Sequence, residues 1–307
     1  EIWMLASFKF RKLTNVVPNV APRASFRRSF SIQSSDFDFD TVVIGGGSGG
    51  IASAQEIGKI WKKKNIHNKI ALIDFVDPSP QNTIWGLGGT CVNVGCIPKK
   101  LMHQASILGD NMQDAKYFGW QDIEKPTLNW TKLTSAIQDH IKSLNWGYRT
   151  SLLDKGVEYI NAKASFVNAN TIECVTKKNK KSLIRSKNFI LAVGGRPRYL
   201  EIPGARELAI TSDDLFSLKN PPGKTLVIGA SYVALECAGF LTGFGYDTTV
   251  MSRSNVFLRH FDQQMAGHIV DYMKEHGTKF ECGIPTRMER TQNDSGPKIT
   301  VHWNGLS

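Results

Sequence analysis

One pattern occurs twice in this sequence: a short apolar strand, a turn of small residues and a helix. In the first copy, strand 41–44 is followed by the turn Gly-Gly-Gly-Ser-Gly-Gly at 45–50. In the second copy, strand 225–228 is followed by Gly-Ala-Ser-Tyr-Val-Ala at 229–234. A strand that enters a helix through such a turn begins a βαβ unit that binds a dinucleotide. The chain is therefore predicted to have an α/β fold with two Rossmann-like dinucleotide-binding domains.

The first turn has small residues at the positions where a bound pyrophosphate needs them. Gly45 would make the tight turn, Gly47 would let the pyrophosphate approach the backbone, and Gly50 would let the helix pack on its strand. The phosphates would lie at the helix N-terminus, where unpaired N–H groups attract anions. Asp74 ends the next strand and is placed to accept hydrogen bonds from a ribose hydroxyl. The alternative interpretation is a glycine turn with a structural role only.

The second turn is less regular, and the residues after the next strand make it informative. Ser231 and Ala234 replace two of the glycines. A site for NADH would place an acidic residue after strand 248–251, but this sequence has Arg253 and Arg259 there. Guanidinium groups bind a phosphate through paired hydrogen bonds, which favours NADPH with its 2′-phosphate. Two solvated loop arginines are the alternative.

Two cysteines separated by four residues, Cys91 and Cys96, lie between the two motifs. Such a pair can close a small disulfide ring, and Pro98 is typical of the first turn of a helix. A helix N-terminus lowers the pKa of a thiol and so favours the thiolate needed for exchange. Half of a zinc site is the alternative, but it would need two further ligands, of which only His103 is close. A redox disulfide that serves two bound dinucleotides is the favoured interpretation.

The number and spacing of all the cysteines indicate the redox state of the cellular compartment. The chain has five cysteines, an odd number at uneven spacing. This argues against a secreted disulfide framework and for a reducing compartment with one functional pair. We expect Cys174, Cys237 and Cys282 to be buried apolar residues.

Positive charge is concentrated near the start of the chain. Residues 1–35 contribute +5 of the net charge of +11, because six Lys or Arg are present with one acid, Glu1. Segment 24–31 is rich in Arg and Ser, which predicts a mitochondrial presequence and a location in the matrix. A disordered basic tail, or translated sequence upstream of Met4, is the alternative, with the cytoplasm as the alternative location. Neither a nucleic acid nor a membrane is expected as partner, because the basic residues lack aromatic platforms and no apolar run approaches about 18 residues.

The segment around the cysteine pair resembles the active site of the FAD-dependent pyridine nucleotide disulfide reductases. The resemblance rests on Gly-Gly-Thr-Cys-Val-Asn-Val-Gly-Cys-Ile-Pro-Lys-Lys at 88–100. Trp-Gly-Leu at 85–87 and Leu-Met-His-Gln-Ala at 101–105 make it most similar to the thioredoxin reductases of animals. The resemblance extends from about residue 40 to the C-terminus. It implies FAD in the first unit and NADPH in the second, electron transfer from NADPH through flavin to the disulfide, thioredoxin as protein substrate, and a homodimer.

The resemblance also implies catalytic roles. Cys96 would face the flavin as the charge-transfer thiol, and Cys91 would be the interchange thiol. Lys99 would lie near the flavin in a buried ion pair with Glu236. Tyr232 would cover the flavin until NADPH displaces it. Aromatic residues near the disulfide would be Trp146 and Tyr148.

Further residues match cofactor contacts of the family, some of them the turn residues introduced above. The expected cofactor-binding residues are Gly45, Gly47, Ser48, Gly49, Gly50, Asp74, Phe75, Thr90, Gly95, Lys99, Ala164, Ser165, Arg196, Gly229, Ala230, Ser231, Arg253, Ser254 and Arg259. No metal site is expected. The implied domains are a presequence at 1–35, an FAD-binding domain with the redox disulfide at 36–194, and an incomplete NADPH-binding domain at 195–307.

The sequence departs from the family pattern in two places. Val193 replaces the threonine usual in an Ala-Thr-Gly turn, and the chain ends at Ser307, within the second nucleotide domain. The segments expected beyond that point are a second FAD contact, an interface domain with a His-Glu pair, and a C-terminal redox tail. On this interpretation, the chain by itself is expected not to turn over.

Three alternatives compete with a thioredoxin reductase. Glutathione reductase has an arginine for glutathione at the position of Gln55, which cannot supply that charge. Dihydrolipoamide dehydrogenase would have an acidic residue for NAD at Arg253. A truncated, non-catalytic nucleotide-binding fragment is the alternative from another class, but such a fragment has no need of the cysteine pair.

Overall fold

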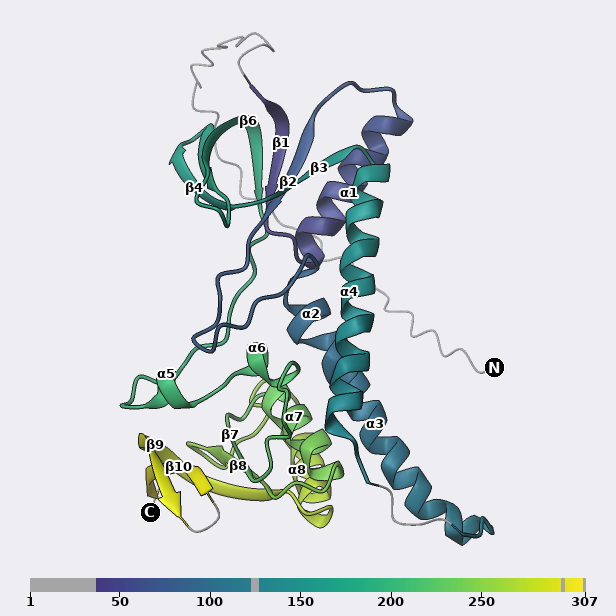
Figure 1. Cartoon of the computed structure of the whole chain (residues 1–307), viewed down its shortest axis with the longest axis vertical. Coiled ribbons are helices and arrows are strands. Elements are labelled where there is room, and N and C mark those ends of the chain that lie inside the picture. Colours follow the sequence, from purple (N-terminus) through teal and green to yellow (C-terminus); the bar gives the residue numbers. More distant parts are fainter. Residues whose placement is uncertain (1–36, 123–126, 294–295, 306–307) are drawn as a thin grey trace, which may run out of the picture. The chain divides into compact units, whose positions relative to one another are not determined.

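A computed structural model describes residues 37–122, 127–293 and 296–305, so the expected presequence at 1–35 lies outside the described residues. Figure 1 labels most of the helices and strands. In chain order they are β1 (Phe39–Ile44), α1 (Ser48–Lys63), β2 (Ile70–Asp74), α2 (Gly89–Val94), α3 (Cys96–Asp114), the 3-10 helix η2 (Ala115–Phe118), α4 (Trp130–Asp154), β3 (Val157–Asn161), β4 (Lys163–Asn168), β5 (Thr171–Val175), β6 (Lys181–Leu191), α5 (Ala205–Leu208), α6 (Ser212–Leu215), β7 (Thr225–Ile228), α7 (Tyr232–Gly243), β8 (Thr248–Ser252), α8 (Gln263–Glu275), β9 (Lys279–Asn293) and β10 (Gly296–Gly305).

The first sheet has the strand order β3-β2-β1-β6-β5-β4. Strand β1 pairs in parallel with β2 and with β6, and β4, β5 and β6 form an antiparallel meander. Residues Val42 and Val43 of β1 are fully buried although they point to opposite faces of the sheet. Burial on both faces is typical of a central strand in a parallel sheet that is covered on each side.

The second sheet has the strand order β10-β9-β8-β7. Strands β7, β8 and β9 are parallel, and β10 returns antiparallel along β9. The first sheet ends with Leu191 and the second begins with Thr225. Two sheets that each contain a parallel strand–helix–strand unit confirm the prediction of an α/β fold with two Rossmann-like domains.

Apolar side chains from both halves of the sequence pack together around α3. This core includes Met102 of α3, Ile137 of α4, Phe216 at the end of α6, and Phe240 of α7, all almost completely buried. Separate cores lie under each βαβ unit. The helix that follows the cysteine pair is therefore held by residues from far along the chain.

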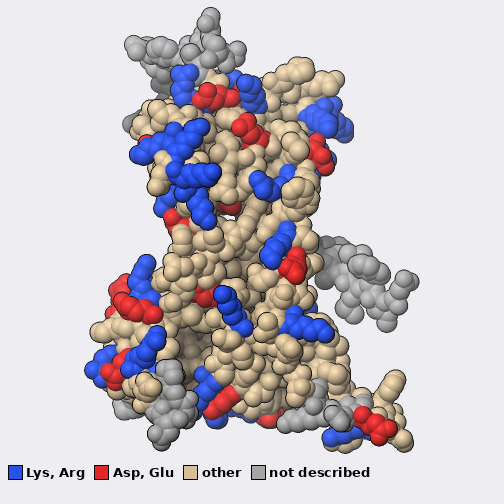
Figure 2. All heavy atoms as spheres, in the orientation of Figure 1, with Lys and Arg blue, Asp and Glu red and all other residues tan. Residues whose placement is uncertain are grey.

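The surface is charged but mixed in sign. Figure 2 shows Lys and Arg side chains gathered over the part of the surface formed by β4–β6. Three lysines of β4 and β6 pair with carboxylates: Lys163 with Asp77, Lys181 with Glu173, and Lys187 with Asp40. Among the described residues, no helix has the length and apolar character needed to cross a membrane.

Candidate active site

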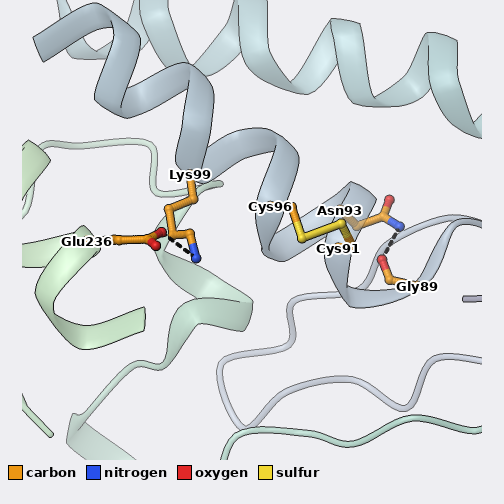
Figure 3. Close-up of a disulfide and its surroundings, with 6 residues drawn as sticks. All are labelled: Gly89, Cys91, Asn93, Cys96, Lys99 and Glu236. Atoms are coloured by element: carbon orange, nitrogen blue, oxygen red, sulfur yellow. Dashed lines mark hydrogen bonds and ion pairs between the residues drawn. A yellow bond between two sulfur atoms is a disulfide. The ribbon is translucent and has the colours of Figure 1, made fainter. Parts of the chain in front are cut away.

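Cys91 and Cys96 form a disulfide, as Figure 3 shows. Cys91 lies within α2 and is half-buried, whereas Cys96 is the first residue of α3 and is exposed. Their Cα atoms are 4.6 Å apart, which is within the range of disulfide-bonded cysteines. In the described part of the chain, no cluster of three or more His, Cys, Asp or Glu could hold a metal ion. The disulfide interpretation of the cysteine pair is confirmed.

Gly95 makes the break between α2 and α3 that lets the two cysteines meet. It is at once the residue after α2 and the residue before α3, with φ −138° and ψ −115°. A Cβ atom at Gly95 would lie 2.9 Å from the carbonyl oxygen of Thr90, closer than side chains approach a backbone. The carbonyl of Gly95 accepts a hydrogen bond from the Lys99 N–H at 3.0 Å, which starts α3. Cys96 therefore lies at the positive end of a 19-residue helix, where a thiolate is stabilised.

Lys99 and Glu236 form an ion pair one turn beyond Cys96 (Figure 3). Lys99 Nζ is 2.6 Å from Glu236 Oε2 and 4.8 Å from the centroid of the Tyr232 ring. The pairing agrees with the prediction, but the expectation of a buried pair was wrong for one partner. The Lys99 side chain is 11% exposed, whereas that of Glu236 is 50% exposed, because Glu236 lies on an outer face of α7. The start of α7 thus places a carboxylate and, one turn before it, an aromatic ring against one cation.

The first nucleotide turn has the geometry that its glycines predict. Gly45 has φ +110°, and a Cβ atom there would overlap the carbonyl of Ala192. At Gly50, a Cβ atom would overlap the carbonyl of Gly45. The N-cap of α1 is Gly47, which provides no side-chain hydrogen bond to the first turn of the helix. The N–H groups of that turn are therefore available to an anion such as a pyrophosphate.

Asp74 lies where β2 ends, next to the first turn. Its Oδ1 accepts a hydrogen bond from the Gly46 N–H at 2.8 Å. Burial raises the pKa of Asp74, and hydrogen bonds from the Gly46 and Phe75 N–H groups counteract part of the rise. The carboxylate thus orients the turn through this hydrogen bond, and its contact with a ribose stays a prediction.

The second nucleotide turn also brings the expected residues to one end of a sheet. Gly229 follows β7 with φ +148°, Ser231 is the N-cap of α7, and a Cβ atom at Gly229 would make ordinary contact with Ala234 at 3.4 Å. Arg253 and Arg259 follow β8, and both are exposed. Two exposed guanidinium groups after the second strand fit a phosphate on the ribose of the nucleotide.

Other predicted site residues are distributed around these elements. Thr90 is exposed beside Cys91, and on α4 Trp146 is exposed whereas Tyr148 is half-buried. Ala164 and Ser165 lie on β4. Of the remaining predicted residues, Ser48 and Gly49 begin α1, Ala230 lies in the second turn, and Ser254 follows β8.

Arg196, predicted to contact a nucleotide, also makes contacts within the protein. Its Nε donates to Asp213 Oδ2 at 2.8 Å, an Nη donates to the Asp77 carbonyl at 2.9 Å, and its guanidinium lies 4.5 Å from the Trp85 ring centroid. The sequence prediction missed Asp213. Burial raises the pKa of Asp213 and Arg196 counteracts the rise, and Oδ1 has no hydrogen-bond partner among the described residues.

Two asparagines near the disulfide were also missed. Asn93 lies between the two cysteines and is buried, and Asn145 of α4 donates a hydrogen bond to its side chain. Asn93 belongs to the motif that carries the family resemblance, but nothing in the sequence pairs it with a residue 52 positions away.

Two dinucleotide turns and a disulfide at the start of a helix between them are the arrangement expected of the pyridine nucleotide disulfide oxidoreductase class. The model of the family described as "Pyridine nucleotide-disulphide oxidoreductase" matches residues 39–304. Because the match covers most of the chain, the chain belongs to this family.

Comparison with individual proteins gives more specific similarities than the family model. Over 270 residues the chain is 56% identical to "Thioredoxin reductase SEP1" of Emiliania huxleyi, a match that covers 88% of this chain and 52% of the relative. A solved structure, a Cu(II) complex of a mutant of the HOCl-induced flavoprotein disulfide reductase RclA from Escherichia coli, has a TM-score of 0.69 at 20% identity. That match covers 86% of this chain and 53% of the other, and it shows a shared fold. The chain thus spans about half the length of these relatives.

Proposed function

We propose that this chain carries the nucleotide-binding and disulfide portion of an NADPH-dependent flavoprotein disulfide reductase, and that the reductase acts on thioredoxin. The observation that carries the proposal is the Cys91–Cys96 disulfide at the start of α3, one turn from the Lys99–Glu236 pair. The high identity to an algal thioredoxin reductase supports the choice of substrate. The resemblance to the animal enzymes remains a prediction from the segment 85–105.

Different residues of this chain would bind the two cofactors of such a reaction. Turn 45–50 and Asp74 would hold FAD, and turn 229–234 with Arg253 and Arg259 would hold NADPH. FAD, when bound, supplies the two-electron carrier between nicotinamide and disulfide.

The polar groups around the cysteines suit the opening of their disulfide. Two electrons and two protons convert the disulfide into two thiols. The start of α3 stabilises negative charge on Cys96, and the Lys99 ammonium one turn further along is paired with Glu236. Cys91 is then free to exchange with the disulfide of a substrate.

The structure offers no support for glutathione as the substrate at Gln55. The Gln55 side chain lies on α1, and its Nε2 donates to Ser151 Oγ at 3.1 Å. A neutral amide already bonded to a neighbour supplies no charge for a glutathione carboxylate. We infer thioredoxin as partner and a homodimer as the assembly, as in the family.

The decisive experiment follows electrons from NADPH into the cysteine pair. The chain is purified, loaded with FAD and mixed with NADPH or NADH, and free thiols are alkylated and counted by mass. We expect two additional alkylated cysteines with NADPH, and none in Cys96→Ser, while Cys282→Ser behaves as the wild type. A chain that retains no FAD, or a disulfide that NADPH leaves closed, would contradict the proposal. In parallel, NADPH consumption by the full-length reductase that contains this chain, with thioredoxin or with oxidised glutathione, distinguishes the two substrates.

We also propose that the protein is delivered to the mitochondrial matrix by residues 1–35. This proposal is supported by the Arg- and Ser-rich composition of that segment. A fluorescent protein fused behind residues 1–35 should enter mitochondria, and replacing Arg27 and Arg28 with Gln should prevent entry. Cytoplasmic fluorescence of the unmodified fusion would refute the proposal.

A further inference from the structure

The side chains of Asn93 and Asn145 connect the disulfide ring to α4. Asn93 lies inside the ring closed by Cys91 and Cys96, and it is 2% exposed. Asn145 Nδ2 donates to Asn93 Oδ1 at 3.0 Å. A buried carboxamide needs partners for both its oxygen and its nitrogen, and this contact satisfies the oxygen of Asn93.

Both carboxamides also donate to carbonyls of segment 86–89, which is the end of the loop before α2 and the first residue of α2. Asn93 Nδ2 donates to the Gly89 carbonyl at 2.8 Å, a bond drawn in Figure 3, and to the Gly86 carbonyl at 3.1 Å. Asn145 Nδ2 donates to the Leu87 carbonyl at 2.5 Å. Because carbonyls surround each nitrogen, the hydrogen-bond network fixes which end of each amide faces the loop.

The same loop is bonded to the first nucleotide turn. The Gly88 N–H donates to the Gly46 carbonyl at 2.9 Å, and a Cβ atom at Gly89 would lie 2.5 Å from the Cα of Gly47. The Gly46 N–H in turn donates to Asp74. A continuous series of hydrogen bonds therefore runs from the disulfide ring to the nucleotide turn. None of them involves sulfur, so opening the disulfide removes none of them.

We propose that Asn93 and Asn145 are positioning residues that hold the two cysteines in place relative to the nucleotide turn in both the disulfide and the dithiol state. The inference rests on the proposed function only in requiring that the disulfide opens and closes. Two thiols held facing each other have a high effective concentration, which favours the closed disulfide. Loosening the loop and the ring should therefore make the disulfide easier to reduce.

The test is the thiol–disulfide equilibrium of the chain with glutathione. One Cys91–Cys96 disulfide and two glutathione thiols exchange to give two cysteine thiols and one glutathione disulfide, and alkylation with mass detection measures the ratio. We expect Asn145→Ala to shift this equilibrium about tenfold toward the dithiol, which is ~30 mV for a two-electron couple. Asn111→Ala, which removes an exposed carboxamide from α3, is the matched control and should leave the equilibrium unchanged.

A second variant separates hydrogen bonding from packing. Asn145→Asp keeps the size of the side chain but removes the donor to Leu87 and Asn93, so it should shift the equilibrium at least as far as Asn145→Ala. The shift in Asn93→Ala combined with Asn145→Ala should be smaller than the sum of the single shifts. A wild-type equilibrium in both Asn145 variants, or a shift in the alanine variant alone, would overturn the proposal. The measurement needs neither FAD nor NADPH, so it stays informative if the proposed electron transfer fails.

Discussion

Removing either charge of the Lys99–Glu236 pair leaves the other charge without its partner, but in different surroundings. In Lys99→Met the apolar part of the side chain is kept, and the remaining Glu236 carboxylate is half-exposed and can be hydrated. In Glu236→Ala the remaining ammonium lies on a side chain that is only 11% exposed, with the Tyr232 ring as its neighbour. The two variants remove the same ion pair, yet we expect unequal losses of stability.

The burial of each partner sets the expected magnitudes. Exposed ion pairs contribute about 0–1 kcal/mol, so Lys99→Met should lower the free energy of unfolding by at most about 1 kcal/mol. Removing one partner of a fully buried pair costs about 3–5 kcal/mol. Because water reaches one side of this pair and the Tyr232 ring retains part of the cation's stabilisation, we expect about 2 kcal/mol for Glu236→Ala. The double variant no longer has a buried cation and should be more stable than Glu236→Ala.

Urea unfolding followed by circular dichroism measures all four chains. The order of midpoints should be wild type, then Lys99→Met, then the double variant, with Glu236→Ala lowest and all slopes equal. Raising the salt concentration should change the midpoint of Lys99→Met little, because its remaining charge is hydrated. If Lys99→Met were as destabilising as Glu236→Ala, or if the second substitution gave no rescue, the reasoning from unequal burial would be refuted.

Three other perturbations test separate parts of the molecule. Gly89→Ala should lower the free energy of unfolding by about 2 kcal/mol or more, because φ is +67° and the new Cβ would overlap the Cα of Gly47 in the nucleotide turn. The control Gly49→Ala places its Cβ with no heavy atom within 4 Å and should destabilise the chain far less in the same urea titration. Burial raises the pKa of Cys237 to about 12, so its thiol should resist iodoacetamide at about pH 8 until urea unfolds the chain; labelling of the folded protein there would contradict this. This shift also predicts that the free energy of unfolding falls as pH rises from about 9 toward about 12, because the folded state binds the proton more tightly. Burial raises the pKa of Asp213, and Arg196→Ala should raise it further. The urea midpoint of that variant should therefore fall more steeply than that of the wild type as the pH rises above the ordinary pKa of a carboxyl group; parallel profiles would show that Arg196 does not stabilise this carboxylate.

Local patterns predicted the parts of this site that depend on local geometry. Glycine spacing predicted the turn at 45–50, and the cysteine spacing with Pro98 predicted a ring at the start of a helix. The pairing of Lys99 with Glu236 came from resemblance, since nothing near Lys99 in the sequence indicates a partner on a helix more than a hundred residues later. The half-exposure of Glu236 depends on how α7 packs, which a sequence pattern does not report.

The missed contacts share one physical cause. Asn145 lies on α4 and Asp213 on α6, but their partners Leu87 and Arg196 lie on irregular loops, as does Trp85. The path of such a loop follows from the packing of the whole chain. An asparagine or aspartate side chain is suited to many surroundings, so its type alone does not indicate which backbone groups it will bind.

The shared core around α3 has a consequence for synthesis on the ribosome. Met102 packs with Phe216 and Phe240, so the apolar face of the helix that follows Cys96 stays uncovered until those later residues have left the ribosome. The first sheet is already complete at Leu191. During that interval a nascent chain exposes both a reactive cysteine pair and an apolar helix face, which is the state that chaperones bind and that aggregates most readily. Translation pauses that occur before Phe240 has emerged from the ribosome should therefore lower the yield of folded protein more than pauses that occur after it has emerged.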